Sequence, residues 1–250
     1  MLDLSRVVPE AQAVVEKASV VYMHHAGRDF LGLIAHGSAV KGGFIAGCSD
    51  VDFQLYLKPS AFDERGHLPF ERTVAIHRDL AHIDPAPFRY IQCYAFGGAR
   101  REGWVGPISG AYAVLAGVLP VPEATPDELR ASAKTLLRNL DSESGLSDKL
   151  LDHGEARLAR QARLMCTDVW PALFCSLIER GGDPIEVWNL TKQQAIAEVP
   201  PETVAGTEIR AFHAALLAHY PTEASVDGAL EILVRGVRFL RAVKSEYAAS

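Results

Sequence analysis

The sequence has few cysteines and no long apolar segment. Four of its 250 residues are cysteine, none at a spacing such as Cys-x-x-Cys, so neither a disulfide framework nor a cysteine metal site is predicted. These residues, expected as small members of a core, are Cys48, Cys93, Cys166 and Cys175. No apolar run reaches the length of a membrane-spanning helix, and charged residues interrupt the N-terminal segment where a signal peptide would be apolar. We therefore expect no membrane partner and a cytoplasmic location.

The sequence also lacks an excess of basic charge. Its 25 lysines and arginines are dispersed among 31 aspartates and glutamates, which gives a formal net charge of −6. Proteins that bind nucleic acid normally carry a clustered basic surface, so the composition argues against a nucleic-acid partner. A mildly acidic surface suits a cationic small molecule instead. The length and the 48% hydrophobic content allow a sizeable core divided between two modest domains, and they leave the oligomeric state open.

Two aspartates define the most informative pattern in the chain. Asp50 and Asp52 stand at the start of an apolar stretch over 51–57 that is typical of a strand. Side chains two residues apart on a strand share a face, so the two carboxylates would project together while the alternate residues face a core. Mg²⁺ takes one or two protein carboxylates and fills its other positions with water and phosphate oxygens. The pair therefore predicts a divalent metal site that a nucleotide completes.

A glycine turn precedes these acids. A short strand over 30–36 runs into Gly37 and Ser38, after which residues 39–41 can form a helical turn. Glycine lets the backbone approach a ligand, while the serine hydroxyl and the free N–H groups of such a turn can hold phosphate oxygens. His36 stands beside the turn, where it either contacts the nucleotide or packs in the core. The turn therefore predicts a phosphate site next to the metal.

The combination resembles a known signature. Gly37-Ser38, an eleven-residue spacer and Asp50-Val51-Asp52 are similar to the pattern of the nucleotidyltransferase superfamily related to DNA polymerase β, especially the bacterial aminoglycoside 3″-type adenylyltransferases. The resemblance implies an Mg²⁺-dependent enzyme that moves AMP from ATP to a hydroxyl of a small molecule. It suggests an aminoglycoside antibiotic as acceptor and antibiotic resistance as the consequence. Asp50 and Asp52 would hold Mg²⁺, while Gly37 and Ser38 would bind the nucleotide.

The resemblance also implies a third carboxylate, which completes the metal site or takes the proton of the attacking hydroxyl. A strand over 88–96 would carry it, and Gln92 stands at its position. An amide can coordinate a metal or hydrogen-bond a hydroxyl, but it accepts no proton near neutral pH. The resemblance assigns Gln92 to the catalytic group by its position. Because an amide accepts no proton there, the identity of the general base stays open. Asp84 and Glu102 flank the strand as alternatives, although a solvated surface role ranks first for both.

A second point of resemblance lies near residue 192. The stretch 188–195 contains a Lys-x-x-Ala turn similar to one whose lysine reaches the ATP phosphates in the adenylyltransferases. Carried over by position, Lys192 would stand in the first turn of a helix with Thr191 as its N-cap, and it would neutralise triphosphate charge. Without the resemblance, a lone helical lysine is more often solvated. Both interpretations stay open for Lys192.

The order of the patterns predicts an α+β fold in two domains. Residues 1–105 are expected to form a nucleotidyltransferase domain, which is a mixed sheet with flanking helices. Residues 106–250 are expected to form an all-α helical bundle that closes over ATP and the acceptor. Strands are predicted over 30–36, 51–57 and 88–96, and helices over 8–28, 69–82, 112–117, 126–141, 153–180, 191–198, 206–220 and 224–247.

Two other functions stay open. Gln92 can mark a catalytically impaired pseudoenzyme that binds nucleotide, or another small ligand, as a sensor. The chemistry can also persist with a different acceptor, as in toxin-like nucleotidyltransferases that modify protein or RNA, although the lack of a basic surface argues mildly against RNA. The sequence leaves the acceptor and the preferred nucleotide open.

Overall fold

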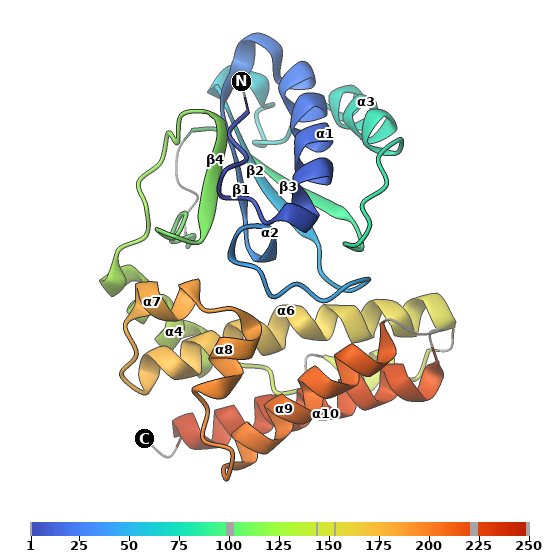
Figure 1. The fold of residues 1–250 in the computed structure, drawn as a ribbon, viewed down its shortest axis with the longest axis vertical. Helices are drawn as coiled ribbons and strands as arrows, with labels where there is room; N and C mark the ends of the chain where they lie inside the picture. Colours follow the sequence, from blue (N-terminus) through green and yellow to red (C-terminus); the bar gives the residue numbers. More distant parts are fainter. Residues whose placement is uncertain (1, 99–102, 144, 153, 221–224, 249–250) are drawn as a thin grey trace. The chain divides into compact units, whose positions relative to one another are not determined.

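The chain folds into two compact units. In the computed structural model, which describes residues 2–98, 103–143, 145–152, 154–220 and 225–248, they comprise Met1–Thr125 and Pro126–Ser250 (Figure 1). The first contains a four-stranded sheet with helices and the second contains α4 to α10. This arrangement confirms the α+β class that the sequence predicted. The division follows Thr125, later than the boundary predicted after residue 105.

The sheet of the first unit is mixed. β1 runs antiparallel to both β2 and β4, while β2 and β3 are parallel. The predicted bounds of β1 and β2 are confirmed, and β3 begins later than the predicted start at residue 88. The strands lie in the order β3-β2-β1-β4, with bounds Phe30–His36 for β1, Val51–Leu57 for β2, Ile91–Phe96 for β3 and Tyr112–Gly117 for β4.

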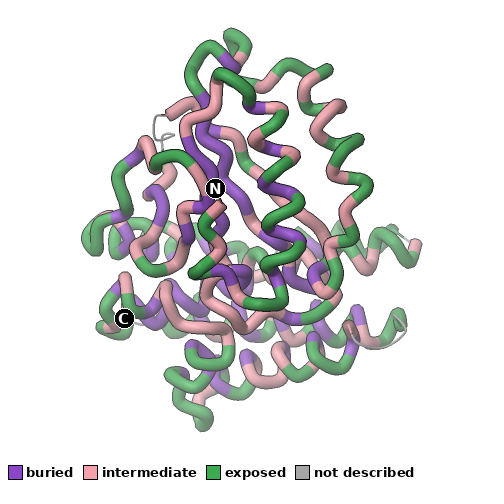
Figure 2. Tube along the Cα trace, turned by 45° about the horizontal axis from the view of Figure 1, so that its top comes forward, coloured by how far each residue is buried: buried purple, intermediate pink, exposed green. Residues whose placement is uncertain are grey.

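Helices cover one face of this sheet. α1 (Pro9–Ala26) and α3 (Phe70–Leu80) pack side by side over it (Figure 1), and both end within two residues of their predicted bounds. The core beneath them contains alternate residues of β1 and β2, such as Leu33 and Phe53, which are fully buried. In Figure 2 the buried segments gather along these strands. The shorter helical turns of this unit are η1 (Gly27–Asp29), α2 (Ser38–Lys41) and η2 (Pro59–Ala61).

The opposite face of the sheet has an apolar end and a polar end. Tyr56 and Phe96 belong to a second buried cluster, and the ring of Trp104 stacks on Phe96 with 4.7 Å between ring centroids. Alternation along the strands places Asp52 of β2 and Gln92 of β3 on the same face, toward the starts of these two parallel strands. Asp52 and Gln92 therefore lie toward the end of this face that the aromatic cluster does not cover.

The segment 112–117 is a strand, so its prediction as a helix was wrong. β4 pairs antiparallel with β1, and its alternate residues Ala113 and Leu115 are buried in the core beneath α1. A Cβ on Gly32 would lie 2.0 Å from the carbonyl oxygen of Val118, so glycine is needed where the two strands meet. Small apolar residues fit a helix or a strand, and the otherwise unpaired edge of β1 decides between them. Because β4 joins the sheet, the first unit extends beyond the predicted boundary.

The second unit is built on three long helices. α10 packs against α6 and α9, and Gly236 of α10 permits a close approach, since a Cβ there would lie 2.4 Å from Cγ of Met165. The five helices predicted for this region are confirmed within three residues at each end, and the short α5 and α7 were not predicted. Among the described residues, none of the helices has the length and apolar character that a membrane span requires. The bounds are Pro126–Arg138 for α4, Leu146–Lys149 for α5, Glu155–Glu179 for α6, Pro184–Asn189 for α7, Lys192–Ala197 for α8, Val204–His219 for α9 and Val226–Ala248 for α10.

Candidate functional site

The turn after β1 brings Gly37 against a carboxylate. Gly37 has φ 69° and ψ −143°, a conformation that residues with a side chain rarely adopt. A Cβ at this position would lie only 2.9 Å from Asp52 Oδ2. Asp52 pairs with His36 in the register of β1 and β2, so strand pairing holds the carboxylate beside the turn. The structure thus brings together the predicted glycine turn and one of the predicted acids.

Ser38 begins α2 directly after this turn. Its side chain is buried, at 8% exposure. The N–H groups of Val40 and Lys41 donate to the carbonyl oxygen of Gly37 at 3.1 and 2.9 Å, and the N–H of Gly42 donates to the carbonyl oxygen of Ser38 at 3.0 Å. These bonds close the helical turn that the sequence predicted over 39–41. They fix Ser38 at the end of β1, where the sequence placed the phosphate site.

Gln92 stands beside Asp52 on the neighbouring strand. The two residues pair in the parallel register of β2 and β3, and paired residues point to the same face of a sheet. Both are half-buried. The register therefore puts Gln92 where the sequence analysis expected a third acid to meet the aspartate pair, and the group has an amide at this point.

Asp50 joins the group through a tyrosine that the sequence analysis did not single out. The Tyr90 hydroxyl oxygen lies 2.6 Å from Asp50 Oδ2 and 2.7 Å from Gln92 Oε1. Tyr90 comes two residues before Gln92, so the two side chains share a face. This spacing is the signal in the sequence that could have identified it. Asp50 Oδ2 and Gln92 Oε1 therefore contact the same hydroxyl oxygen, which places the two side chains next to each other.

His36 ends β1 between the glycine turn and the acids. Burial lowers its pKa to about 4; the negative charge of Asp50 opposes this shift, and the positive charge of Lys41 adds to it. The ring is therefore neutral at neutral pH. Its Nε2 atom is buried and has no hydrogen-bond partner within the described part of the chain. Because Nε2 is buried and the ring resists protonation, the structure favours packing over nucleotide contact for His36.

The oxygen donors in this group fit a metal that shares its coordination with a ligand. Among the described residues, no three His, Cys, Asp or Glu side chains are grouped to hold an ion, so a complete protein cage is absent there. Asp50, Asp52 and the amide oxygen of Gln92 are hard donors of the kind that Mg²⁺ prefers. The glycine turn leaves space beside Asp52 that any Cβ would fill. These features fit Mg²⁺ with phosphate and water in its remaining positions.

Of the other sequence candidates near the strand, Asp84 has a structural role. Asp84 is exposed, and its carboxylate accepts a hydrogen bond from the N–H of Ala86 at 3.0 Å, as a turn residue does. Glu102 lies outside the described residues. None of the four cysteines forms a disulfide within the described part of the chain, and two of them are buried. Burial raises the pKa of Cys93 and of Cys175 to about 12, so these thiols stay protonated and do not serve as nucleophiles.

Lys192 belongs to the second unit and begins α8. Thr191 Oγ1 accepts a hydrogen bond from the N–H of Gln194 at 3.3 Å, and Gln194 Oε1 accepts one from the N–H of Thr191 at 2.9 Å. This reciprocal pair is a capping box and confirms Thr191 as the N-cap. Lys192 is half-buried, and its Nζ lies 5.7 Å from the centroid of the Trp170 ring, within the range of a cation–π interaction. The lysine is therefore held against the bundle rather than extended into solvent.

His213 flanks the same aromatic ring. It meets Trp170 edge to face with 6.1 Å between centroids. Burial lowers the pKa of His213, and the positive charge of Lys192 lowers it further. Lys192 of α8, Trp170 of α6 and His213 of α9 thus form a group of one cation, one large aromatic ring and one imidazole whose neutral form is favoured.

The fold of the chain is similar to that of a solved structure. The crystal structure of spectinomycin adenyltransferase AAD(9) from Enterococcus faecialis, with ATP and spectinomycin, aligns over 90% of this chain and 97% of its own chain. The TM-score is 0.50 and the sequence identity is 13%. This likeness shows a shared fold. No protein-family model and no curated protein matches the sequence.

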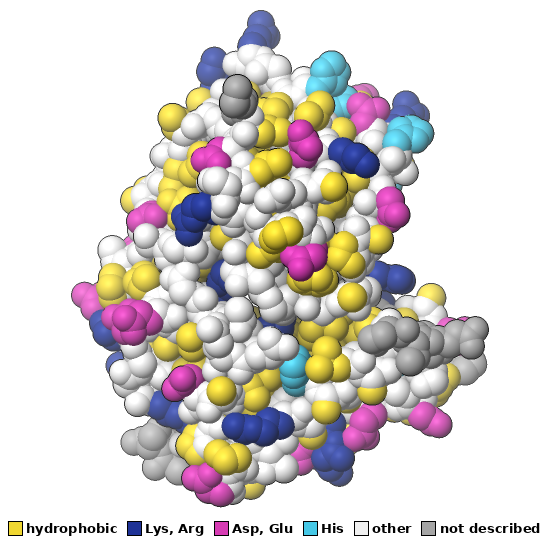
Figure 3. All heavy atoms as spheres, in the orientation of Figure 1, with side chains coloured by type: hydrophobic (Ala, Val, Ile, Leu, Met, Phe, Trp, Pro, Cys, Tyr) yellow, Lys and Arg dark blue, Asp and Glu magenta, His cyan; other side chains and the backbone are white. Residues whose placement is uncertain are grey.

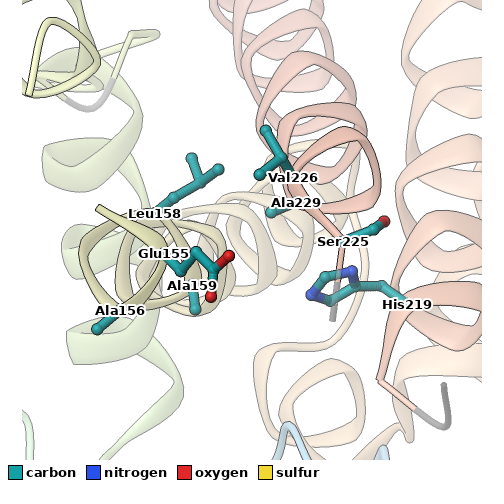
Figure 4. A pocket seen from close by; sticks show the side chains of 8 residues that line it. All are labelled: Glu155, Ala156, Leu158, Ala159, His219, Ser225, Val226 and Ala229. Atoms are coloured by element: carbon teal, nitrogen blue, oxygen red, sulfur yellow. The ribbon is translucent and has the colours of Figure 1, made fainter. Parts of the chain in front are cut away.

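A cavity in the second unit contains none of the predicted site residues. It encloses about 180 Å³ between the start of α6, the end of α9 and the start of α10 (Figure 4). Pockets that hold drug-sized ligands usually exceed roughly 300 Å³. The hydroxyl of Ser225 accepts a hydrogen bond from the N–H of Gly228 at 3.0 Å, so it caps α10. The cavity lining is typical of helix ends, and it comprises Glu155, Ala156, Leu158, Ala159, His219, Ser225, Val226 and Ala229.

Proposed function

We propose that this protein is an Mg²⁺-dependent nucleotidyltransferase that moves AMP from ATP to a hydroxyl group of a small molecule. The observation that carries the proposal is the close contact of Asp52 with the Gly37 turn, next to Gln92, in a fold similar to that of an adenyltransferase. A carboxylate beside a glycine turn suits a phosphate chain that arrives with a metal ion, because the turn leaves room and the carboxylate supplies a ligand.

The named residues would divide the work of binding. Gly37 and Ser38 would contact the nucleotide phosphates through the backbone and the hydroxyl. Asp50 and Asp52 would hold Mg²⁺. Lys192 would neutralise charge on the β- and γ-phosphates, a role supported by its half-buried position and its fixed place at a capped helix start.

The transfer forms a bond from the acceptor oxygen to the α-phosphorus and breaks the bond from that phosphorus to the bridging oxygen, so that pyrophosphate leaves. Mg²⁺, when bound, would stabilise the negative charge on the phosphate oxygens. The acceptor hydroxyl also loses a proton. The amide of Gln92 accepts none and the Nε2 atom of His36 is buried, so within this group the carboxylates of Asp50 and Asp52 are the remaining acceptors. We therefore expect slow turnover in which alignment supplies most of the rate.

The acceptor would be a small hydroxyl-bearing molecule, with aminoglycosides as the first class to test. The similar structure was solved with spectinomycin, and a net charge of −6 suits a cationic acceptor. On the face shown in Figure 3, basic and acidic side chains are interspersed. This distribution supports a small acceptor over RNA, which a clustered basic surface would favour.

Calorimetric titration with ATP, with and without Mg²⁺, tests the proposal. We expect ATP binding that requires Mg²⁺, and pyrophosphate release when an aminoglycoside such as spectinomycin is added. Asp52→Asn should abolish both while preserving the fold, because it removes a metal ligand. Glu64→Gln, which removes one negative charge from an exposed residue of the same unit, is the matched control and should behave as wild type. Full ATP binding and release by Asp52→Asn would overturn the mechanism.

A second function is favoured by Gln92 itself. An amide in register with Asp52 suits a protein that binds nucleotide without transferring it, such as a sensor. Gln92→Glu separates the two functions, since a carboxylate at this position could accept the proton. Pyrophosphate release that appears only in Gln92→Glu would identify a pseudoenzyme, whereas release by the wild-type chain would identify a transferase.

A further inference from the structure

The Tyr90 hydroxyl stands at the junction of two predicted site residues. It lies 2.6 Å from Asp50 Oδ2 and 2.7 Å from Gln92 Oε1. Both distances are ordinary for hydrogen bonds between oxygens, and Tyr90 is half-buried. Tyr90 therefore contacts one residue that would hold the metal and one that replaces the expected third acid.

The single proton of the phenol determines which atoms donate and which accept hydrogen bonds in this group. A phenol hydroxyl carries one proton and can donate it to one acceptor at a time. Asp50 is the stronger acceptor because its carboxylate is charged. In the structure the amide atom nearest the hydroxyl is Gln92 Oε1; with the amide rotated by half a turn, Nε2 would donate to the Tyr90 oxygen and both contacts would be satisfied hydrogen bonds. In that arrangement a chain of donors runs from Gln92 through Tyr90 to Asp50.

The backbone fixes where the phenol can reach. The N–H of Val51 donates to the carbonyl oxygen of Tyr90 at 3.1 Å, and the N–H of Arg89 donates to the carbonyl oxygen of Ser49 at 2.8 Å. These bonds join the two residues before β3 to the chain on both sides of Asp50, at the start of β2. The position of Tyr90 is thus set by strand pairing and not by a free loop.

We propose that Tyr90 is a positioning residue that holds Asp50 for metal-assisted nucleotide binding, an inference that rests on the proposed function. Its hydrogen bond to Oδ2 of Asp50 would orient the carboxylate that would hold the metal ion. Groups that hydrogen-bond a metal-binding carboxylate typically change metal affinity by about 10- to 100-fold when removed, because they orient the ligand. Gln92 would support this arrangement through the turned amide, whose Nε2 can donate to the Tyr90 oxygen, as an ionised carboxylate cannot.

The test measures the Mg²⁺ concentration that gives half-maximal ATP binding, by calorimetry on the full chain. In Tyr90→Phe this midpoint should rise by about tenfold or more, while ATP binding at saturating Mg²⁺ returns close to the wild-type value. Tyr94→Phe is the matched control, because Tyr94 lies on the same strand and is 51% exposed. Its midpoint should equal that of wild type.

A combined variant distinguishes positioning from a general loss of structure. In an Asp50→Glu background, which keeps a carboxylate for Mg²⁺ but moves it from its place beside the Tyr90 hydroxyl, adding Tyr90→Phe should change the midpoint no further, since the residue that Tyr90 positions is already altered. Additive effects would overturn the inference. If Tyr90→Phe does not fold, Gln92→Leu tests the chain of hydrogen bonds from its other end and should raise the midpoint, and an unchanged midpoint would overturn the inference.

The result for the wild-type chain separates this inference from the proposed function. A wild-type chain without Mg²⁺-dependent ATP binding overturns the proposed function and the inference together. A wild-type chain that binds, with Tyr90→Phe titrating identically, overturns the inference alone.

Discussion

Two turns carry the predicted phosphate contacts, and they are held in different ways. The turn at Gly37 is positioned by long-range pairing, because β1 and β2 bring it against Asp52. The shape of the turn at Lys192 is fixed locally, because Thr191 and Gln194 close a capping box within four residues of chain. Each turn starts a short helix, yet only the second has a cap of side-chain hydrogen bonds built from its own residues.

This difference indicates how each turn should respond to substitution. A turn packed against another segment has no space to adjust, so a single added methyl group affects its neighbour directly. A locally capped turn keeps its shape when an outward side chain changes, since its hydrogen bonds lie within the turn. We therefore expect substitutions at Gly37 to have larger effects than substitutions at Lys192.

Gly37→Ala should produce the largest effect. The new Cβ would meet Asp52 Oδ2 at 2.9 Å, and φ 69° with ψ −143° is strained for alanine. We expect a loss of about 1–3 kcal/mol in the free energy of unfolding, and a loss on the order of 10- to 100-fold in Mg²⁺-dependent ATP affinity because Asp52 must move. Chemical denaturation and calorimetry measure the two quantities.

Gly66→Ala is the control for backbone strain. Gly66 has φ 76° and no atom lies within 4 Å of the position that its Cβ would take, so alanine there adds strain without touching the site. It should lower stability and leave ATP affinity unchanged. Equal loss of ATP affinity in both variants would show that the contact with Asp52 is irrelevant.

The Gly37 turn could be predicted from sequence because its residue types are unusual. Glycine, serine and two spaced aspartates among apolar residues leave few other structures, and the strands on both sides of them appear at the predicted residues. Gln92 could be placed for a related reason, since its strand pairs in parallel with β2. The spacing of residues in the sequence was sufficient for the prediction wherever it determined which face of a strand a side chain occupies.

The remaining features depend on contacts that spacing does not encode. The small apolar residues at 112–117 suit either regular structure, and only pairing with β1 makes them a strand. The spacing to Gln92 places Tyr90 on the same face, but the hydrogen bond of Tyr90 to Asp50, 40 residues away, could not be predicted from it. Trp170 could not be placed beneath Lys192 from sequence, because the contact joins α6 to α8. Tertiary packing decided each case.

Lys192→Ala should have an intermediate effect. If Lys192 binds phosphate, its loss should weaken ATP affinity by about tenfold, the value expected for one charge-assisted contact. Stability should change little, because the capping box remains and a cation–π contact contributes only about 0.5–1 kcal/mol. Lys134→Ala, which removes an exposed lysine from α4 of the same unit, is the control. Unchanged ATP affinity in Lys192→Ala would assign the lysine to packing on Trp170.

The smallest effect should appear at His213, whose ring can report on Lys192. Burial lowers the pKa of His213 and the charge of Lys192 lowers it further. The folded chain therefore binds fewer protons than the unfolded chain, and this histidine makes the protein less stable as the pH falls through the ordinary value of about 6.5. In Lys192→Ala the pKa of His213 should rise but stay below that value, because burial remains.

Binding of Mg²⁺ and ATP to the wild-type chain should also raise the pKa of His213 if the phosphates reach Lys192, since they cancel the ammonium charge. NMR titration of the histidine rings measures both shifts, and a pKa of His213 that ATP leaves unchanged in a chain that binds ATP would separate Lys192 from the phosphate site.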